Sequence, residues 1–269
     1  MGDDISDIQA FYDRIVEQEN ERLERHPIER DITWRYLEKY LPPRGKILEI
    51  GAATGAYTIP LARRGYMITA VDLSPKLMDV CKKRIAEERL EKKVTCLVAD
   101  ARDLSCVPGS NFDAVLLMGP LYHLVLEEDR KTALKEAFNR LKPDGVIFSA
   151  FISRYGIWGD IMKKVPHMIE AQADVQSIFQ RGRDSDNPSP EISFRAYFAK
   201  VSEAETLHQK AGFKTLVLAG VEPAGVDDES YKNLQGTRKQ LWLDLLFSIS
   251  TEESIIGAST HLLYIGVKE

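Results

Sequence analysis

The residues best placed for chemistry follow three apolar runs of the sequence. The first run leads into Glu49–Gly55, which reads EIGAATG and precedes a helical pattern. Asp72 ends the second run, and Asp100 follows the third. A glycine-rich turn between a strand and a helix presents backbone N–H groups to a ligand, and an acid after the next strand can accept hydrogen bonds from a ribose diol. These positions predict a site for a nucleoside-containing cofactor.

Two classes of cofactor are bound at such a turn. A dinucleotide site has the spacing G-x-G-x-x-G, whereas Gly51 and Gly55 here flank Ala53. An acid such as Asp100 suits the amino group of an adenine, and a dinucleotide dehydrogenase does not require it. Each feature also has a structural interpretation: the turn could merely connect strand and helix, Asp72 could cap a helix, and Asp100 could form a turn. Their common order along the chain favours a cofactor site.

The elements that must hold these residues alternate regularly between residues 46 and 151. Apolar runs predict buried strands, and helical patterns lie between them. The predicted strands are 47–50, 67–71, 94–98, 114–118 and 146–151, and the predicted helices are 58–64, 75–88 and 128–141. Alternation of this kind predicts a parallel sheet with right-handed crossovers.

Less regular segments flank this core. The first 40 residues contain two helical patterns, and residues 152–200 contain an amphipathic helix and the polar loop QRGRDSDNPSP. The capping box SEAE then predicts a helix beginning at Ser202. A strand at 214–219, a helix at 229–247 and a strand at 261–268 follow. We expect a single domain, 1–269, in which 1–40 form a helical cap, 41–151 the cofactor-binding core, 152–200 a lid insertion and 201–269 the C-terminal part of the sheet.

Taken in order, EIGAATG, AVDLSP, LVADARDL and FDAVLLMGPLYHL resemble the class I S-adenosylmethionine-dependent methyltransferases of the small-molecule type. The resemblance covers residues 46–151 well and is weaker elsewhere. It implies an α/β fold, a doubly wound seven-stranded mixed sheet with its last strand antiparallel and a helical cap. It also implies S-adenosylmethionine as the cofactor and S-adenosylhomocysteine as the product.

The resemblance implies cofactor contacts residue by residue. The positions matched by Glu49, Gly51 and Gly55 line the methionine part of the cofactor in the family. Asp72 matches the acid that holds the ribose hydroxyls, and Leu73 matches the side chain against the adenine. The remaining matches are Asp100 and Ala101 at the adenine edge and Met118 beneath the sulfonium.

Ala53 stands where the family usually has a glycine. A methyl group at this position narrows the approach to the cofactor, and a positive φ there would strain an alanine. We therefore expect a modest loss of cofactor affinity rather than a site that no longer binds the cofactor.

Methyl transfer is an in-line displacement, so catalysis is mostly alignment of the acceptor, the methyl carbon and the sulfur. A base is needed where the acceptor carries a proton. The segment MGPLYHL resembles the Asn/Asp-Pro-Pro-Tyr loop that acts on planar amino groups, but Gly119 has no side chain to hold such a nitrogen. His123 is the candidate general base, and Tyr122 is a candidate wall of the site. The alternative for His123 is a packed histidine that caps the following helix.

The cap and the lid offer further candidates for contact with the acceptor. Aromatic and cationic side chains at these places could enclose a cation or line an apolar pocket. The candidates are Tyr12, Tyr155, Trp158, Arg195 and Tyr197. Ordinary packing is the alternative for each of them.

Composition argues against several other classes. The 269 residues carry a formal net charge of -5 without a block of Lys or Arg, so no nucleic-acid partner is expected. No apolar run approaches the roughly 20 residues of a membrane span, and the acidic N-terminus does not resemble a signal peptide. The three cysteines are scattered, show no metal-ligand spacing and fit a reducing cytoplasm.

The sequence therefore predicts a cytoplasmic enzyme that transfers a methyl group from S-adenosylmethionine to a small-molecule acceptor, without a metal. It specifies neither the acceptor atom, which could be oxygen, nitrogen, sulfur or carbon, nor the oligomeric state. Two alternatives stay open. One is a protein methyltransferase, and the other is a protein that binds S-adenosylmethionine without catalysis.

Overall fold

The computed structural model of the chain describes residues 2–186 and 195–269. Its strands are β1 (Lys46–Ile50), β2 (Met67–Asp72), β3 (Val94–Val98), β4 (Phe112–Leu117), β5 (Leu141–Ser153), β6 (Phe198–Ala199), β7 (Phe213–Gly220) and β8 (His261–Lys268). Its helices are α1 (Ser6–Arg14), α2 (Val16–Asn20), α3 (Arg22–Arg25), α4 (Pro27–Tyr40), α5 (Thr58–Arg63), α6 (Pro75–Glu87), α7 (Pro120–His123), α8 (Glu127–Arg140), α9 (Trp158–Lys164), the 3-10 helix η1 (Pro166–Glu170), α10 (Gln172–Arg181), α11 (Val201–Lys210), α12 (Asp228–Lys232), α13 (Gly236–Ile249) and α14 (Glu253–Ala258). Residues 187–190 of the loop QRGRDSDNPSP lie outside the described residues. Within the described ranges, no helix is both long and apolar enough to cross a membrane.

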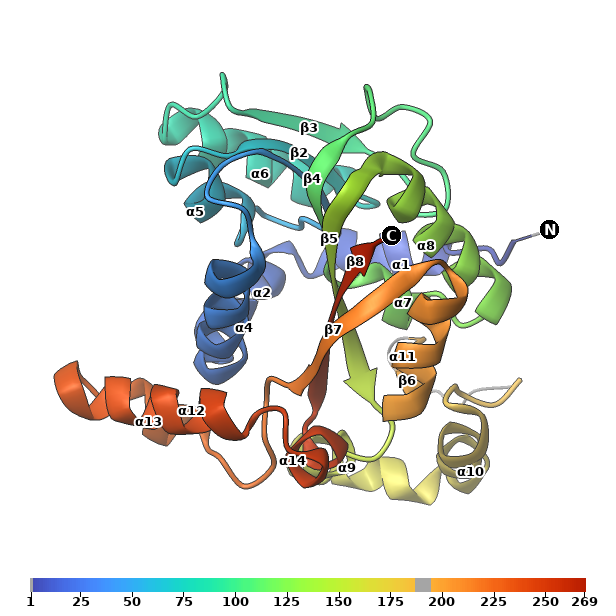
Figure 1. The fold of residues 1–269 in the computed structure, drawn as a ribbon. Coiled ribbons are helices and arrows are strands. Elements are labelled where there is room, and N and C mark those ends of the chain that lie inside the picture. Colours follow the sequence, from blue (N-terminus) through green and yellow to red (C-terminus); the bar gives the residue numbers. More distant parts are fainter. Residues whose placement is uncertain (1, 187–194) are drawn as a thin grey trace.

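One mixed sheet organises the chain (Figure 1). Its strand order is β3-β2-β1-β4-β5-β8-β7, and β6 adds a short pairing to the end of β5. β8 runs antiparallel to both β5 and β7, whereas the other pairs are parallel. The predicted doubly wound sheet with an antiparallel last strand is therefore confirmed, with β6 as an addition. Because the order reverses between β1 and β4, a crevice is expected at the carboxyl ends of these strands.

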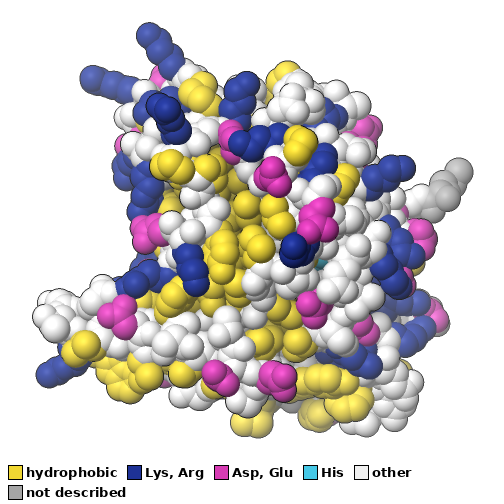
Figure 2. Space-filling model, in the orientation of Figure 1, with side chains coloured by type: hydrophobic (Ala, Val, Ile, Leu, Met, Phe, Trp, Pro, Cys, Tyr) yellow, Lys and Arg dark blue, Asp and Glu magenta, His cyan; other side chains and the backbone are white. Residues whose placement is uncertain are grey.

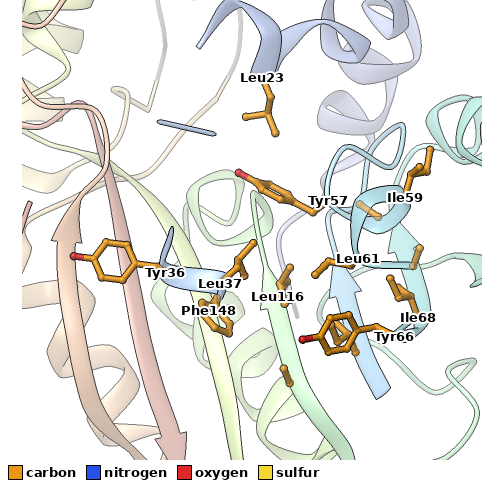
Figure 3. Packing of buried hydrophobic residues seen from close by; sticks show 14 of the residues in the cluster. Leu23, Tyr36, Leu37, Tyr57, Ile59, Leu61, Tyr66, Ile68, Leu116 and Phe148 are labelled. Carbon is orange, nitrogen blue, oxygen red and sulfur yellow. The ribbon is translucent and has the colours of Figure 1, made fainter. Parts of the chain in front are cut away.

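Helices cover both faces of the sheet. On one face, α4, α5 and α6 contribute to an apolar cluster with the strands, and on the other face α8 and α11 do so. Figure 3 shows the first cluster, in which Leu37, Leu116 and Phe148 are fully buried. The central strands are thus covered on both faces, which explains why they form continuous apolar runs in the sequence.

α12 and α13 extend beyond the edge of the sheet (Figure 1). They replace the single helix predicted at 229–247, because the chain turns after α12 and Gly236 adopts a φ of +55°. α13 packs against α4, where the ring centroid of Phe247 lies 4.7 Å from that of Tyr36. Figure 2 views the molecule in the same orientation and shows hydrophobic side chains in the middle of the visible surface and along its lower edge. Leu241 and Trp242 of α13 are among the exposed hydrophobic residues, so this helix is packed on one side only.

The N-terminal segment and α11 differ from the sequence prediction in their boundaries. Two helices were predicted in residues 1–40, but the structure has four there, with interruptions at Ile15, Glu21 and His26. None of these three side chains accepts a capping hydrogen bond from the helix that follows it. α11 begins at Val201, earlier than predicted, because the acid of its capping box is Glu203 rather than Glu205. The Glu203 carboxylate accepts a hydrogen bond from the Lys200 N–H at 3.0 Å.

A partly buried ionic cluster links the N-terminal helices to the sheet. His26 Nδ1 lies 2.8 Å from Glu222 Oε1, and His261 Nδ1 lies 2.5 Å from Glu222 Oε2. Beside them, Arg22 donates two hydrogen bonds to Glu29, at 2.9 and 3.0 Å. His26, Glu29 and Glu222 could each offer a ligand atom to a cation, but Arg22 and the histidines already neutralise both carboxylates. We name His26, Glu222 and His261 the His–Glu–His clasp.

Stability should depend on pH through this clasp. Hydrogen bonds to Asp228 and Glu222 raise the pKa of His26 from 6.5 to about 9. Stabilisation from a raised pKa is complete below the unfolded value and is lost as pH rises through the folded value. At pH 6, His26→Gln should melt roughly 2–4 °C lower for a loss of about 1 kcal/mol, and the difference should shrink towards pH 10. His167→Gln, at an exposed histidine, is the control; equal melting of both variants at pH 6 would contradict this role.

Candidate active site

A cavity lies at the carboxyl ends of β1, β2 and β4, beneath the N-terminal segment. It holds about 640 Å³ of empty space, counting its open mouth. The residues singled out from the sequence that line it are Tyr12, Gly51, Ala53, Asp72, Leu73, Asp100, Ala101, Met118, Tyr122 and His123. The sequence analysis did not assign Ile5, Ile8 and Glu19 to the site, although they also line it. These three lie on the irregular N-terminal segment, which carries no motif.

The glycine-rich turn lies against the start of α7. Gly51 has a φ of +83°, and a Cβ built on it would lie 2.7 Å from both Met118 O and Pro120 Cδ. Only glycine therefore fits at this position without displacing backbone. Ala53 has a φ of +46°, so the strain expected from the sequence is present at this alanine. Its N–H donates to Asp72 Oδ2 at 2.8 Å.

Removing the Ala53 methyl group should relieve this strain. An L-residue in the left-handed region costs about 1–3 kcal/mol, whereas a glycine costs about 0.5–1 kcal/mol of additional chain entropy. We expect Ala53→Gly to bind S-adenosylhomocysteine a few times more tightly in calorimetry, without loss of stability. Ala52→Gly is the matched control, because Ala52 is outside the positive-φ residues; it should lower stability and leave affinity unchanged. A fall in affinity of Ala53→Gly would contradict the argument.

Two acids lie on the cofactor side of the cavity. Asp72 accepts hydrogen bonds from the N–H groups of Ala53 and Ser74, and burial raises its pKa. Asp72 does not cap α6, since the Ser74 hydroxyl accepts from the Leu77 N–H instead. The Asp100 carboxylate accepts from Arg102 Nε at 2.9 Å and from Arg102 Nη2 at 2.6 Å. Both acids are thus held in place while their side chains line the cavity.

Glu49 and Gly55, two further predicted cofactor residues, lie behind the turn and are not among the lining residues. Glu49 is buried and accepts a hydrogen bond from the Thr58 hydroxyl at 2.5 Å. Burial raises the pKa of Glu49 to about 8. A Cβ at Gly55 would lie 3.0 Å from Cys81 Sγ of α6. In this structure both residues support the turn from within the core.

The other side of the cavity carries a tyrosine–histidine pair. Tyr12 Oη of α1 lies 2.7 Å from His123 Nε2 of α7, and His123 Nδ1 lies 3.4 Å from the Arg195 carbonyl oxygen. Because a carbonyl can only accept, we assign the proton to Nδ1, which leaves Nε2 to accept from the Tyr12 hydroxyl. Burial lowers the pKa of His123 to about 4 and raises that of Tyr12 well above its ordinary value. The pair is therefore uncharged at neutral pH, and α8 begins without a side-chain cap from His123.

The remaining predicted acceptor residues do not line this cavity. Tyr155 is half exposed, and its ring contacts Phe179, whereas Trp158 packs against the apolar cluster beneath α9 and α10. The Arg195 guanidinium pairs with Asp3 and Asp7. The backbone N–H of Tyr197 donates to the Tyr122 carbonyl at 2.7 Å. Arg195 and Tyr197 thus contact the α7 segment through their backbones rather than presenting side chains to the cavity.

The sheet order, the glycine turn and the acids after β2 and β3 define the class of protein, a Rossmann-like nucleotide-binding fold. Residues 47–145 match the family described as "Methyltransferase domain". The chain is 29% identical over 114 residues to the putative methyltransferase YqeM of Bacillus subtilis, covering 42% of this chain and 44% of that protein. It is 30% identical over 120 residues to a ubiquinone biosynthesis O-methyltransferase of Xanthomonas axonopodis pv. citri, covering 44% and 48%.

A solved structure shows the same fold over the whole length. Magnesium protoporphyrin IX methyltransferase from Synechocystis PCC 6803 with bound SAH aligns with a TM-score of 0.60 at 13% identity, covering 99% of this chain and 100% of that one. The fold predicted from the motifs is therefore confirmed, and residues 47–145 match a methyltransferase domain, as the resemblance to the class I S-adenosylmethionine-dependent methyltransferases implied. The sequence matches cover less than half the length of the two curated relatives named above.

Proposed function

We propose that the chain transfers the methyl group of S-adenosylmethionine to a small-molecule acceptor. The observation that carries this proposal is the sharing of one cavity by two sets of residues. Gly51, Asp72 and Asp100 lie on the cofactor side, and Tyr12 and His123 lie opposite. The relative described as acting in ubiquinone biosynthesis supports a small acceptor. The acceptor atom is left open.

The residues present fit the cofactor. Asp72 is the last residue of β2, where its carboxylate can accept hydrogen bonds from the ribose diol. Leu73 and Ala101 supply apolar surface for the adenine, with Asp100 at its edge, and Met118 lies on the side assigned to the sulfur. Bound S-adenosylmethionine supplies an electrophilic methyl group. The three acids in or near the cavity, Glu19, Asp72 and Asp100, favour a ligand that carries positive charge.

The tyrosine–histidine pair can move a proton from the acceptor. If the acceptor carries a proton, Tyr12 Oη takes it while the tyrosine's own proton passes along the 2.7 Å hydrogen bond to His123 Nε2. The Nδ1–H directed to the Arg195 carbonyl keeps the ring in the tautomer that can accept. The lowered pKa of His123 keeps Nε2 unprotonated over the physiological range. Tyr122 lies beside this pair and lines the acceptor side of the cavity.

We also propose that the chain works as one domain and that residues 152–200 cover the acceptor. The support is the packing of Tyr122 against the apolar cluster beneath α9 and α10, together with the hydrogen bond from Tyr197 N–H to Tyr122. A covered acceptor site favours a small molecule over a protein side chain, which is the first alternative. The second alternative, cofactor binding without catalysis, would leave the tyrosine–histidine pair without a chemical role.

The test is a screen of small amines, phenols, thiols and carboxylates with S-adenosylmethionine labelled at the methyl group. We expect label to appear in one of these classes and S-adenosylhomocysteine to form in equal amount. Label found only in added protein would favour a protein methyltransferase. Tight binding of both sulfur cofactors without any product would favour the non-catalytic alternative.

A further inference from the structure

A second cavity is lined by residues of α8, α10 and α11, together with Arg154 and Tyr197. It holds about 770 Å³ of empty space, counting its open mouth. Four cationic side chains line it, and two carboxylates accompany them: Arg130, Arg154, Arg181 and Lys210 with Glu127 and Glu203. None of these residues lines the cofactor cavity. The surplus of cations in a hollow predicts a preference for anions.

Arg130 is one of two buried cations that line this cavity, the other being Arg154. Arg130 is 5% exposed, and its guanidinium carbon lies 3.4 Å from the ring centroid of Tyr197. Nη1 donates to the Leu124 carbonyl at 2.6 Å, but the described residues provide no acceptor for the buried Nε. Burial lowers the pKa of Arg130, the direction expected for a cation that has lost water. Burying a guanidinium with few acceptors is costly, and an anion against the edge of Arg130 that lines the cavity would offset part of that cost.

The two carboxylates in the cavity have partners of their own. Glu203 Oε2 accepts from Arg154 Nη2 at 2.6 Å and from the Tyr197 hydroxyl at 2.7 Å. The Glu127 carboxylate lies 3.0 Å from the amino group of Lys131, which is not among the lining residues. Glu203 therefore neutralises the charge of Arg154, and Glu127 is paired with Lys131. Neither of these two ion pairs includes Arg130.

The exposed edge of α11 adds further donors at the mouth. Ser202, Thr206 and Lys210 all line the cavity. Their spacing of four residues places them on one face of the helix. Arg181 also lines the cavity; its Nε and Nη2 donate to the Ser177 hydroxyl at 3.1 and 2.8 Å, and its Nη1 lies 3.5 Å from Asp186 Oδ2. Two hydroxyls and two cations thus line the cavity together with the buried Arg130.

From this arrangement we infer that the second cavity binds the oxyanion group, phosphate or carboxylate, of a small molecule distinct from the methyl donor and the acceptor. Guanidinium groups match the planar and tetrahedral oxygens of such groups with paired hydrogen bonds. The inference does not depend on methyl transfer, because it concerns a separate set of residues.

The test uses the purified chain, with inorganic phosphate and malonate as probes. Each is titrated by calorimetry and by thermal melting, against sodium chloride of equal ionic strength. We expect saturable binding with a Kd on the order of 1 mM or tighter, weakened about tenfold or more in Arg130→Gln. Tighter binding of phosphate than of malonate would identify a phosphate-bearing ligand, and the reverse order a carboxylate-bearing one.

Lys135→Gln is the matched control, because it removes the same charge from an exposed side chain of α8 that does not line the cavity. Its affinity for either probe should equal that of the unmodified protein. If Arg130→Gln fails to fold, Arg181→Gln at the rim takes its place, with an expected loss of several-fold. Binding no stronger than that of chloride, or equal losses in Lys135→Gln and the cavity variants, would overturn the inference.

Discussion

Replacing His123 with alanine is expected to lower turnover by about 10²–10⁴-fold, with cofactor affinity near that of the unmodified protein. The loss should be this large because Nε2 is the acceptor for the Tyr12 hydroxyl in the active-site cavity. Tyr12→Phe should lose turnover to a similar degree. Since the two groups act on one proton, the double variant should be hardly slower than either single variant.

The pH profile tests the same assignment. Burial lowers the pKa of His123 to about 4, and only the neutral imidazole accepts a proton. The contribution of His123 is therefore present above about pH 4 and lost as pH falls through that value. We expect no inflection from this group between pH 6 and 8, whereas a histidine with its usual pKa would give one near 6.5.

A second buried histidine supplies the control. His208 stacks on Tyr264 with ring centroids 3.7 Å apart, and its Nε2 lies 2.9 Å from the Ser149 hydroxyl. His208→Gln should lower the melting temperature and leave turnover per folded molecule unchanged. If His123→Ala behaves in the same way as His208→Gln, then His123 is a packing residue and the proposed proton path is wrong.

Asp72→Ala is expected to weaken binding of S-adenosylmethionine and S-adenosylhomocysteine by about 100-fold or more. Hydrogen bonds to a charged group are worth about 1.5–3 kcal/mol each, and the ribose diol can donate two. Calorimetry gives the affinities, and the gain in melting temperature on adding either compound should nearly vanish in the variant, since that gain follows from binding. The unmodified protein should bind neither NAD nor NADP.

The Asp72 carboxylate also holds the turn, which must be separated from its contact with the ribose. Removing it leaves the N–H groups of Ala53 and Ser74 without their acceptor. Asp72→Asn retains an acceptor oxygen for the turn and should keep more affinity than Asp72→Ala. Asp79→Ala, at an exposed carboxylate of α6, controls for the loss of one charge. An unchanged affinity in a folded Asp72→Ala protein would exclude the assigned role.

Most of the sheet and the cofactor side of the site could be predicted from the sequence because they depend on local patterns. Strands buried on both faces give unbroken apolar runs, and the carboxyl ends of neighbouring parallel strands must meet. The order of Gly51, Asp72 and Asp100 along the chain is therefore enough to place them in one crevice. The positive φ of Ala53 was predictable for the same reason, since the turn between β1 and α5 demands it.

The acceptor side could not be predicted in the same way. Tyr12 and His123 are separated by 111 positions, and nothing in the spacing of either residue indicates the other. Glu19 comes to the cavity only because the N-terminal segment breaks into short helices. Tyr155 carries the residue type expected at a binding site but points to Phe179 instead. Such contacts are decided by packing between distant segments, which residue types alone do not specify.

The position of β8 has a consequence for how the protein is made. β8 lies between β5 and β7 although it follows both of them in the chain, and it pairs Val146 with Val267. During synthesis, β7 has no neighbouring strand until residues 261–268 have left the ribosome. The nascent chain can assemble β1 to β5 earlier, because domains form from the N-terminal side as they emerge. Until then, β5 presents an open edge along its length, and this is the stage at which the nascent protein is most exposed to pairing with another chain.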